Sequence, residues 1–467
     1  MAYFTHFSTL SPGRKRAVLP ALCAITLAPT TYASQQVLLG LALSGVALPS
    51  LGHVYGRFIC GAAITATLVL IHAALASRYI ARTYPTGGIP QAARESLGPF
   101  PTLIAEAALL MTGVLTVSVS VSIVVQSIHP ISLLTRLYLS PLSLGIVGAC
   151  LLTGVSMTDG ARLARIRAYV VAFFVLMVSV LIVAGLVGSD AAPRLTGTAI
   201  ISSLPPDYGS AHPHPVLGLI GLVIALNAFA SGCVAAAGTT VDGAASSDPQ
   251  GRSSALSVIA AALIFLGIAA LCARLHIVFW SGRGGVASPV MEQLAAAVFG
   301  LTGRFRWLGV ALRLATVAIL LAAAQSGLVL AGRIVSRRGV GRYAASFATI
   351  PAGQRNFRTG ILVAGVLSAL VILVFRANPV RQISLYTAGT SILLVVVHCC
   401  IAIYSLRERG RWWLISLLFS LAGAMVAAIV CDVASRGETS AGNLAVPTTM
   451  AALAGVLFLI RQRAGAA

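Results

Sequence analysis

The carboxylate of Glu106 is the only acidic group well inside a long apolar run of this sequence, residues 100–127. A charged side chain within the membrane is costly and is by default a functional candidate, as a proton carrier or as the counter-charge to a cation. A helix beginning near Pro101 would place Glu106 about 7 to 8 Å from the cytoplasmic end, where it could instead pair with interfacial arginines. The sequence therefore leaves two roles open for Glu106, a coupling residue or an interfacial anchor.

The other reactive side chains form no set that could carry out catalysis or hold a metal. His72 and His398 stand alone in apolar runs, where a lone histidine is more often a hydrogen-bonded core residue than a proton carrier. His212 and His214 have no third ligand nearby and are expected in an external loop. Arg313, near the outer end of another run, is expected to extend to the membrane interface. We therefore predict no enzymatic activity, no catalytic residue, no metal site and no cofactor.

The composition predicts that these residues lie on helices within a lipid bilayer. Of 467 residues, 58% are hydrophobic and 9% are charged, whereas about a quarter of the residues in soluble domains are charged. Spanning the hydrocarbon layer takes about 20 apolar residues per helix, and the alternating segments of a membrane β-barrel are not found. The net charge of +21 is dispersed in short clusters without a basic face, so no nucleic-acid partner is expected.

Twelve apolar runs lie between charged or Pro/Gly-rich breaks, which predicts about twelve transmembrane helices. With the N-terminus in the cytoplasm, most basic residues fall in cytoplasmic connections, including 78–94, 162–167 and 333–358, as the positive-inside rule favours. The expected location is the inner (plasma) membrane, with both termini cytoplasmic and the first run a span rather than a signal peptide. The predicted runs are 17–46, 57–80, 100–127, 139–158, 168–188, 215–238, 255–279, 308–332, 358–375, 383–405, 412–432 and 444–460.

The first and the sixth runs are interrupted by residues that break helices. Pro29 lies within the first run, and proline removes a backbone donor and clashes one turn back, which predicts a break at Ala28–Thr31. The sixth run carries polar and small residues over Asn227–Gly232, where irregular backbone is tolerated only against protein or a wet cavity. Close helix packing through small residues is the alternative. If both runs are broken, the candidate substrate-binding residues are Thr31, Asn227 and Ser231.

Each interrupted run opens a block of five helices, and two more helices follow the second block. Paired interruptions of this kind are typical of inverted five-helix repeats, whose half-helix ends build a substrate site near the bilayer midplane. We therefore predict an all-α, polytopic membrane fold with a 5+5 inverted repeat. Its expected parts are a cytoplasmic segment (1–16), the two repeats (17–188 and 215–406), two appended helices (412–460) and a cytoplasmic tail (461–467).

Four further segments resemble one known family, the amino acid-polyamine-organocation (APC) superfamily, and within it the branch of high-affinity potassium importers. Residues 83–98 (TYPTGG followed by ARESLG) look like the family's glycine-rich loop before the third helix. Residues 109–120 (LLMTGVLTVSVS) are similar to its third helix, 228–233 (AFASGC) to its sixth and 384–389 (SLYTAG) to its tenth. The resemblance implies twelve helices in the LeuT-like arrangement, moving a small solute.

The resemblance also implies a set of binding residues with neutral oxygen atoms. Tyr32, Thr116, Ser120 and Tyr386 match the family's tyrosine and hydroxyl positions in the first, third and tenth helices. The two acidic positions of the family's potassium site fall on Ile25 and Thr112, and a further hydroxyl position falls on Val234. A site without carboxylates offsets less of a cation's dehydration, although neutral oxygens alone can coordinate potassium.

Three functions follow from these observations. The first is a secondary transporter, an APC-type permease, that moves a small cation, with potassium favoured by the resemblance. The second is an amino-acid permease whose half-helix N-termini bind the substrate carboxylate. The third is a membrane sensor or scaffold that does not transport. The expected partners are a small-molecule or ion substrate and the lipid bilayer, and a homodimer is left open.

Overall fold

Helices make up the part of the chain that the computed structural model describes, which is residues 27–28, 63–64, 67, 71, 75–76, 79–80, 83–84, 88–128, 140–157, 160–187, 252–275, 277, 290–300, 305–337, 352–408, 414–416 and 418. In chain order the helices are α4 (Gly88–Ser96), α5 (Pro99–Ile128), α7 (Pro141–Ser156), α8 (Gly160–Val187), α11 (Arg252–Leu275), α12 (Val290–Phe299), α13 (Arg306–Arg337), α14 (Ala352–Val374) and α15 (Pro379–Arg407).

Six of the described helices are long and apolar enough to cross a membrane, namely α5, α8, α11, α13, α14 and α15. Each follows an apolar run that predicts a span, because the chain in lipid must satisfy every backbone group within its own helix. The predicted span at 139–158 is the shorter apolar helix α7. The runs at 17–46, 215–238 and 444–460 lie outside the described residues, apart from Leu27 and Ala28.

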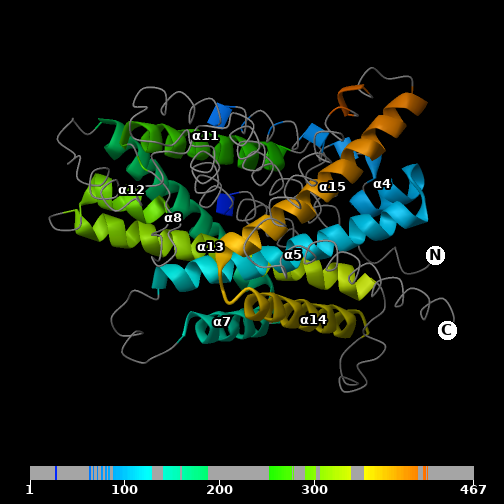
Figure 1. The fold of residues 1–467 in the computed structure, drawn as a ribbon, viewed down its shortest axis with the longest axis horizontal. Helices are drawn as coiled ribbons and strands as arrows, with labels where there is room; N and C mark the ends of the chain where they lie inside the picture. The colour runs from blue at the N-terminus through cyan, green and yellow to red at the C-terminus, as the bar shows by residue number, and fades with distance from the viewer. Residues whose placement is uncertain are drawn as a thin grey trace, which may run out of the picture.

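Helix α5 is the centre of the bundle (Figure 1). Its apolar window is completely buried, and α13, α15, α14, α7 and α4 all pack against it. By contrast, α8 exposes large apolar side chains, among them Leu176 and Val183, as expected of a helix that faces lipid. A fully enclosed helix that also carries buried hydroxyl groups is the natural place for a polar site.

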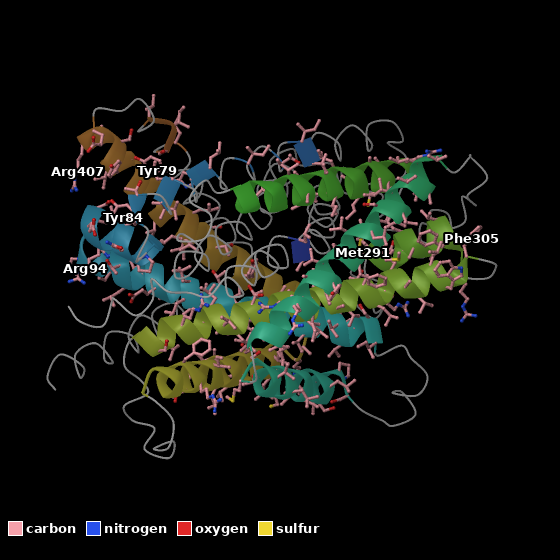
Figure 2. The ribbon with its side chains drawn as sticks, turned by 180° about the vertical axis from the view of Figure 1, so that it is seen from behind. Tyr79, Tyr84, Arg94, Met291, Phe305 and Arg407 are labelled. Atoms are coloured by element: carbon pink, nitrogen blue, oxygen red, sulfur yellow. The ribbon has the colours of Figure 1, made fainter. Side chains whose placement is uncertain are left out.

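The two ends of the bundle differ in character. Figure 2 shows Tyr79, Tyr84, Arg94 and Arg407 together at one end, with Met291 and Phe305 at the other. The Tyr404 ring contacts those of Tyr79 and Tyr84 edge-on, with centroids 5.7 and 6.5 Å apart. These contacts join the C-terminal end of α15 to the segment that leads into α4.

Three connections predicted as loops contain helical residues. The family-like segment before α5 forms helix α4, and the connection between α11 and α13 contains α12. The arginines predicted in the loop 162–167 lie in the first turns of α8, where the Arg167 Nη1 donates to Ser326 Oγ of α13 at 3.3 Å. A span predicted from its apolar run stops at the first charged residue. The helix itself can continue through arginines, because their long aliphatic stems cover apolar neighbours.

Candidate functional site

A row of hydroxyl groups follows one stripe of α5, at the depth where the helix is completely enclosed. Thr112, Thr116 and Ser120 are spaced four residues apart and are 0%, 8% and 1% exposed. Thr112 Oγ1 donates to the Ala108 carbonyl at 2.8 Å, and Thr116 Oγ1 donates to the Thr112 carbonyl at 2.7 Å. Because each of these two hydroxyls uses its hydrogen on the carbonyl one turn back, its oxygen keeps lone pairs for a cation or another donor.

Thr116 lies where α5 and α13 cross most closely. The helices meet at Gly113 and Gly327, and a Cβ added to Gly327 would be 2.8 Å from the Gly113 carbonyl oxygen and 3.0 Å from Thr116 Cβ. Small residues at a crossing let helix backbones approach each other in the membrane. The glycine pair therefore fixes the position of the Thr116 side chain against α13.

Tyr386 of α15 lies beside the same central helix. The Met111 methyl group of α5 lies against Gly389 of α15, and the C-terminal end of α15 lies beside the residues that lead into α4 and α5. The two helices are therefore antiparallel, so that residues before Gly389 lie beside residues after Met111. With a rise of about 1.5 Å per residue, Tyr386 and Thr116 lie about 4 to 5 Å and 7 to 8 Å from this contact along their helices. Tyr386 is 2% exposed.

Four predicted site residues, Thr31, Tyr32, Asn227 and Ser231, lie outside the described residues. Ala28, three residues before Thr31, is helical and 1% exposed. Its side chain belongs to a small apolar cluster with Val119 of α5 and Leu320 of α13. The chain just before the predicted first break therefore contacts the two helices that carry Thr116 and Gly327.

Glu106 lies far from the hydroxyl row. It is half-buried in the N-terminal half of α5, ten residues before Thr116, which corresponds to about 15 Å along the helix. The structure thus does not bring Glu106 to the level of Thr116, and its coupling role stays a prediction. His398 is 2% exposed, with Nδ1 2.8 Å from the Leu394 carbonyl oxygen, as expected of a hydrogen-bonded core histidine. His72 lies outside the described residues.

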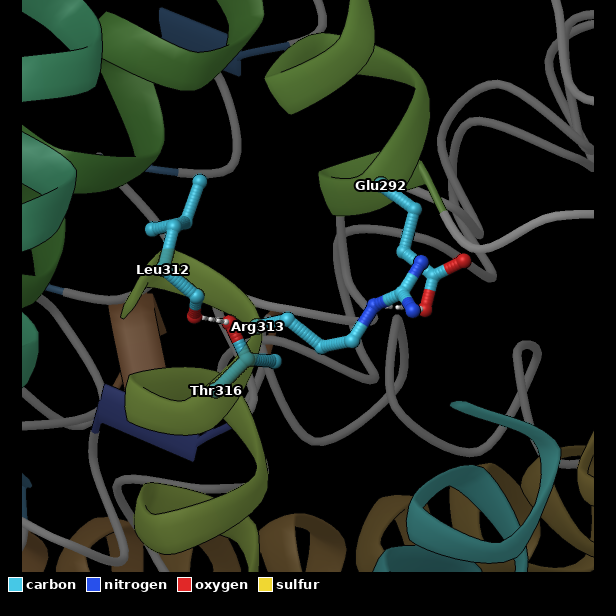
Figure 3. A network of polar contacts seen from close by, with 4 residues as sticks. All are labelled: Glu292, Leu312, Arg313 and Thr316. Atoms are coloured by element: carbon cyan, nitrogen blue, oxygen red, sulfur yellow. Dashed lines mark hydrogen bonds and ion pairs between the residues drawn. The ribbon is translucent and has the colours of Figure 1, made fainter. Parts of the chain in front are cut away.

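A second polar feature, a cavity of about 230 Å³, lies between the C-terminal end of α5, the short helix α12 and the beginning of α13. Glu292 of α12 and Arg313 of α13 face each other there, with Arg313 Nε 3.2 Å from Glu292 Oε1 (Figure 3). Their side chains are 17% and 44% exposed, respectively. Arg313 is therefore paired with a carboxylate on a helix that is absent from the predicted spans. Its extension to the membrane interface stays a prediction.

Replacing Glu292 with glutamine is expected to change stability in a pH-dependent way. Burial raises the pKa of the Glu292 carboxyl above its ordinary value, and the Arg313 charge lowers it by less. Because the pKa is raised, the charged form of Glu292 lowers the stability of the folded state at high pH. This loss of stability disappears as the pH falls and Glu292 takes up a proton. Glu292→Gln should therefore equal or exceed the wild type in Tm at pH 8, by at most about 2 °C, with the difference shrinking toward pH 5.

The measurement is thermal unfolding of the purified protein across this pH range. Arg306 and Arg313 are the charged residues that line the cavity with Glu292. Glu408→Gln, at an exposed position just after α15, is the control for removing one negative charge. A clear loss of Tm in Glu292→Gln at pH 8 would show that pairing outweighs burial.

The sequence analysis missed Glu292 because it treated the region between two apolar runs as a loop. The stretch 290–299 (VMEQLAAAVF) does carry a helical pattern, since Val290, Met291, Leu294 and Ala295 are all buried. No short-range pattern links Glu292 to Arg313. Among the residues that the structure describes, no three His, Cys, Asp or Glu side chains gather as a metal site would require.

Comparison with known proteins identifies one curated relative and several structural neighbours. No protein-family model matches the chain. The chain is 26% identical over 430 residues to the potassium transporter KimA of Bacillus subtilis. The aligned region covers 90% of this chain and 66% of that relative's length. A Na⁺-coupled sialic acid symporter in its substrate-bound, outward-open state has a similar structure, with a TM-score of 0.52, 14% identity and coverage of 92% of this chain and 90% of the symporter. The manganese transporter of Eremococcus coleocola gives a TM-score of 0.50 at 11% identity, with coverage of 96% and 93%.

These comparisons confirm the resemblance to the APC superfamily and its potassium-importing branch, and the all-α, LeuT-like fold of a multi-pass membrane protein. The proteins named here are transporters rather than enzymes, in agreement with the prediction of a chain without enzymatic activity. At these identities the structural neighbours show the fold alone. The predicted breaks in the first and sixth spans lie outside the described residues, apart from Ala28.

Proposed function

We propose that this chain is a secondary membrane transporter of the APC type that moves a small cation, with potassium as the favoured cargo. The observation that carries the proposal is the enclosed hydroxyl row of α5, Thr116 and Ser120, together with the buried Tyr386 on α15, a helix that packs against α5. Neutral oxygens in a dry environment can replace part of a cation's hydration shell, as carbonyl rings do in potassium channels. The similarity to a curated potassium transporter supports this cargo over other small solutes.

The remaining predicted residues would complete the site from the two broken helices. Thr31 and Tyr32 follow Ala28, which already contacts α5 and α13, and Asn227 and Ser231 would approach from the sixth span. Rocking of one repeat, 17–188, against the other, 215–406, would expose this site to each side in turn. Glu106 is the proposed coupling residue, and segments 1–16, 412–460 and 461–467 are proposed as the N-terminal segment, the appended helices and the tail.

The proposed location is the plasma membrane, with both termini in the cytoplasm. Arg94 and Arg407 lie at one end of the bundle, with Met291 and Phe305 at the opposite end (Figure 2). Basic residues near span ends favour the cytoplasmic side. In this orientation the cavity between α12 and α13 lies at the outer face.

Uptake into proteoliposomes tests the proposed function directly. Vesicles that contain the purified protein should accumulate radioactive rubidium, as a potassium analogue, well above protein-free vesicles. Unlabelled potassium should compete, and an imposed pH gradient should change the rate if a proton is coupled. Parallel vesicles receive a panel of labelled amino acids. Uptake of an amino acid without rubidium would establish the amino-acid permease, whereas no uptake of either would favour a sensor or scaffold.

A further inference from the structure

A buried glutamine of α15, Gln382, has no hydrogen-bond partner for its side chain among the residues that the structure describes. The residue is 0% exposed, and neither Oε1 nor Nε2 makes a hydrogen bond in the structure. Leaving a buried amide unpaired costs about 1 to 3 kcal/mol, so buried polar groups are nearly always paired with protein, water or an ion. An amide left in this state is available to bind a group from outside the described residues, such as an ion or a water molecule.

The position of Gln382 directs it toward the central helix. Gln382, Tyr386 and Gly389 are spaced at i, i+4 and i+7, so they share one stripe of α15. Gly389 faces α5, because the Met111 methyl group lies against it. Gln382 therefore faces α5, one helical turn before the tyrosine of the proposed cation site.

A second orphaned polar group lies on the facing stripe of α5. Ser122 is 0% exposed, and its Oγ makes no hydrogen bond in the structure. Met111, Ser118 and Ser122 are spaced at i, i+7 and i+11, so Ser122 shares the stripe that meets α15. Since a hydroxyl can nearly always find a backbone carbonyl on its own helix, its lack of one here is a second, independent sign of a missing ligand.

The two groups lie within about one helical turn of each other along the bundle. Counted from the contact between Met111 and Gly389, Gln382 is about 10 Å along α15 and Ser118 is about 10 Å along α5. Ser122 lies about one further turn along, toward the C-terminal end of α5. The antiparallel helices thus place an unpaired amide and an unpaired hydroxyl on facing surfaces, beyond Tyr386 on the side of the predicted outer face.

We propose that Gln382 and Ser122 bind the transported cation at a second position between α5 and α15, which the ion occupies before it reaches Tyr386. The inference rests on the proposed function and extends it. The Gln382 amide oxygen and the Ser122 hydroxyl are hard, neutral oxygen donors of the kind that suit a partly dehydrated monovalent cation. A second position of this kind would supply additional oxygen ligands to the cation in a chain that lacks the family's two carboxylates.

The test begins with Gln382→Leu, which keeps the volume of the side chain and removes both polar atoms. The variant should fold at least as stably as the wild type, because an unpaired amide is replaced by an apolar group. Its KM for rubidium uptake should rise about ten- to hundredfold, as expected for loss of one ligand to a charged group. Gln91→Leu in α4 is the matched control and should leave KM unchanged.

Two more variants separate cation binding from other roles. Gln382→Glu should lower KM for rubidium, because it adds a negative charge at the ligand position, and it should raise KM if the cargo carries a carboxylate. Ser122→Ala should raise KM, and the double variant Gln382→Leu with Ser122→Ala should be little worse than Gln382→Leu alone, since both residues contact one ion. Wild-type KM in Gln382→Leu and Ser122→Ala would mean that the two groups hold only a buried water, and would overturn the proposal.

A binding measurement distinguishes failure of this site from failure of transport. Potassium chloride should raise the Tm of the purified wild type above its value in choline chloride, and Gln382→Leu should lose most of that rise. Stabilisation without rubidium uptake would refute the proposed function and leave the cation site standing. Rubidium uptake that no Gln382 variant alters would refute the site alone. Neither stabilisation nor uptake in the wild type would refute both.

Discussion

Gly327→Ala is expected to destabilise the protein strongly and to abolish most of its transport. The new Cβ would lie 2.8 Å from the Gly113 carbonyl oxygen and 3.0 Å from Thr116 Cβ, closer than such atoms normally approach. Backbone atoms cannot move aside singly, so α5 and α13 must separate along their crossing. Overpacking of this kind costs about 1 to 3 kcal/mol, and the separation also displaces the Thr116 hydroxyl from its place against α13. We expect a loss of several degrees in Tm and at least a tenfold loss of rubidium uptake.

The matched control is Gly309→Ala in the same helix. No atom lies within 4 Å of the position that its Cβ would take, so the new methyl group meets open space. Alanine is the better helix former by about 1 kcal/mol, and the Tm of this variant should stay the same or rise. Equal Tm values for Gly327→Ala and Gly309→Ala, measured by thermal unfolding in detergent, would contradict the close crossing at Gly113.

The membrane helices could be predicted from the sequence because lipid imposes one simple requirement on them. A span needs about 20 apolar residues and must satisfy its own backbone, so the run 100–127 predicts α5 nearly to its ends. The same reasoning misses α12, because ten residues are too few to cross a membrane and the helix owes its place to packing. It also begins α8 too late and ends α13 too early, because arginines lie within the first turns of α8 and the last turns of α13.

Some residues of the candidate site could also be predicted, in this case from the family resemblance rather than from the apolar pattern. The resemblance identified Thr116, Ser120 and Tyr386, and the structure buries all three on neighbouring helices. The sequence gives no sign that Gln382 is unpaired, because a glutamine at the start of an apolar run is usually an interfacial residue. Only the packing of α15 against α5 shows that this amide is enclosed. Tertiary contacts of this kind depend on helix pairing, which local patterns do not encode.

Removing the hydroxyl groups of the proposed site should impair transport while leaving the fold intact. Thr116→Val keeps the shape of the side chain and removes the oxygen that the Thr112 carbonyl holds in place at 2.7 Å. Tyr386→Phe removes one phenolic oxygen from α15. If each oxygen contacts a bound cation, each substitution should raise KM for rubidium about tenfold, and the double variant should show little uptake. Initial rates of rubidium uptake into proteoliposomes over a range of concentrations give these values.

Thr153→Val supplies the control that isolates cargo binding from the loss of a helical hydroxyl bond. Thr153 Oγ1 donates to the Ala149 carbonyl at 2.7 Å, the same arrangement as at Thr116, but the Thr153 side chain lies against Gly365 of α14 rather than against α13. The two valine variants should therefore have similar Tm values, since both lose one hydroxyl bond to the preceding turn. Only Thr116→Val should change KM. Unaltered flux in both Thr116→Val and Tyr386→Phe would refute the assignment of these residues, because a dehydrated cation cannot lose two of its few neutral ligands without a change in affinity.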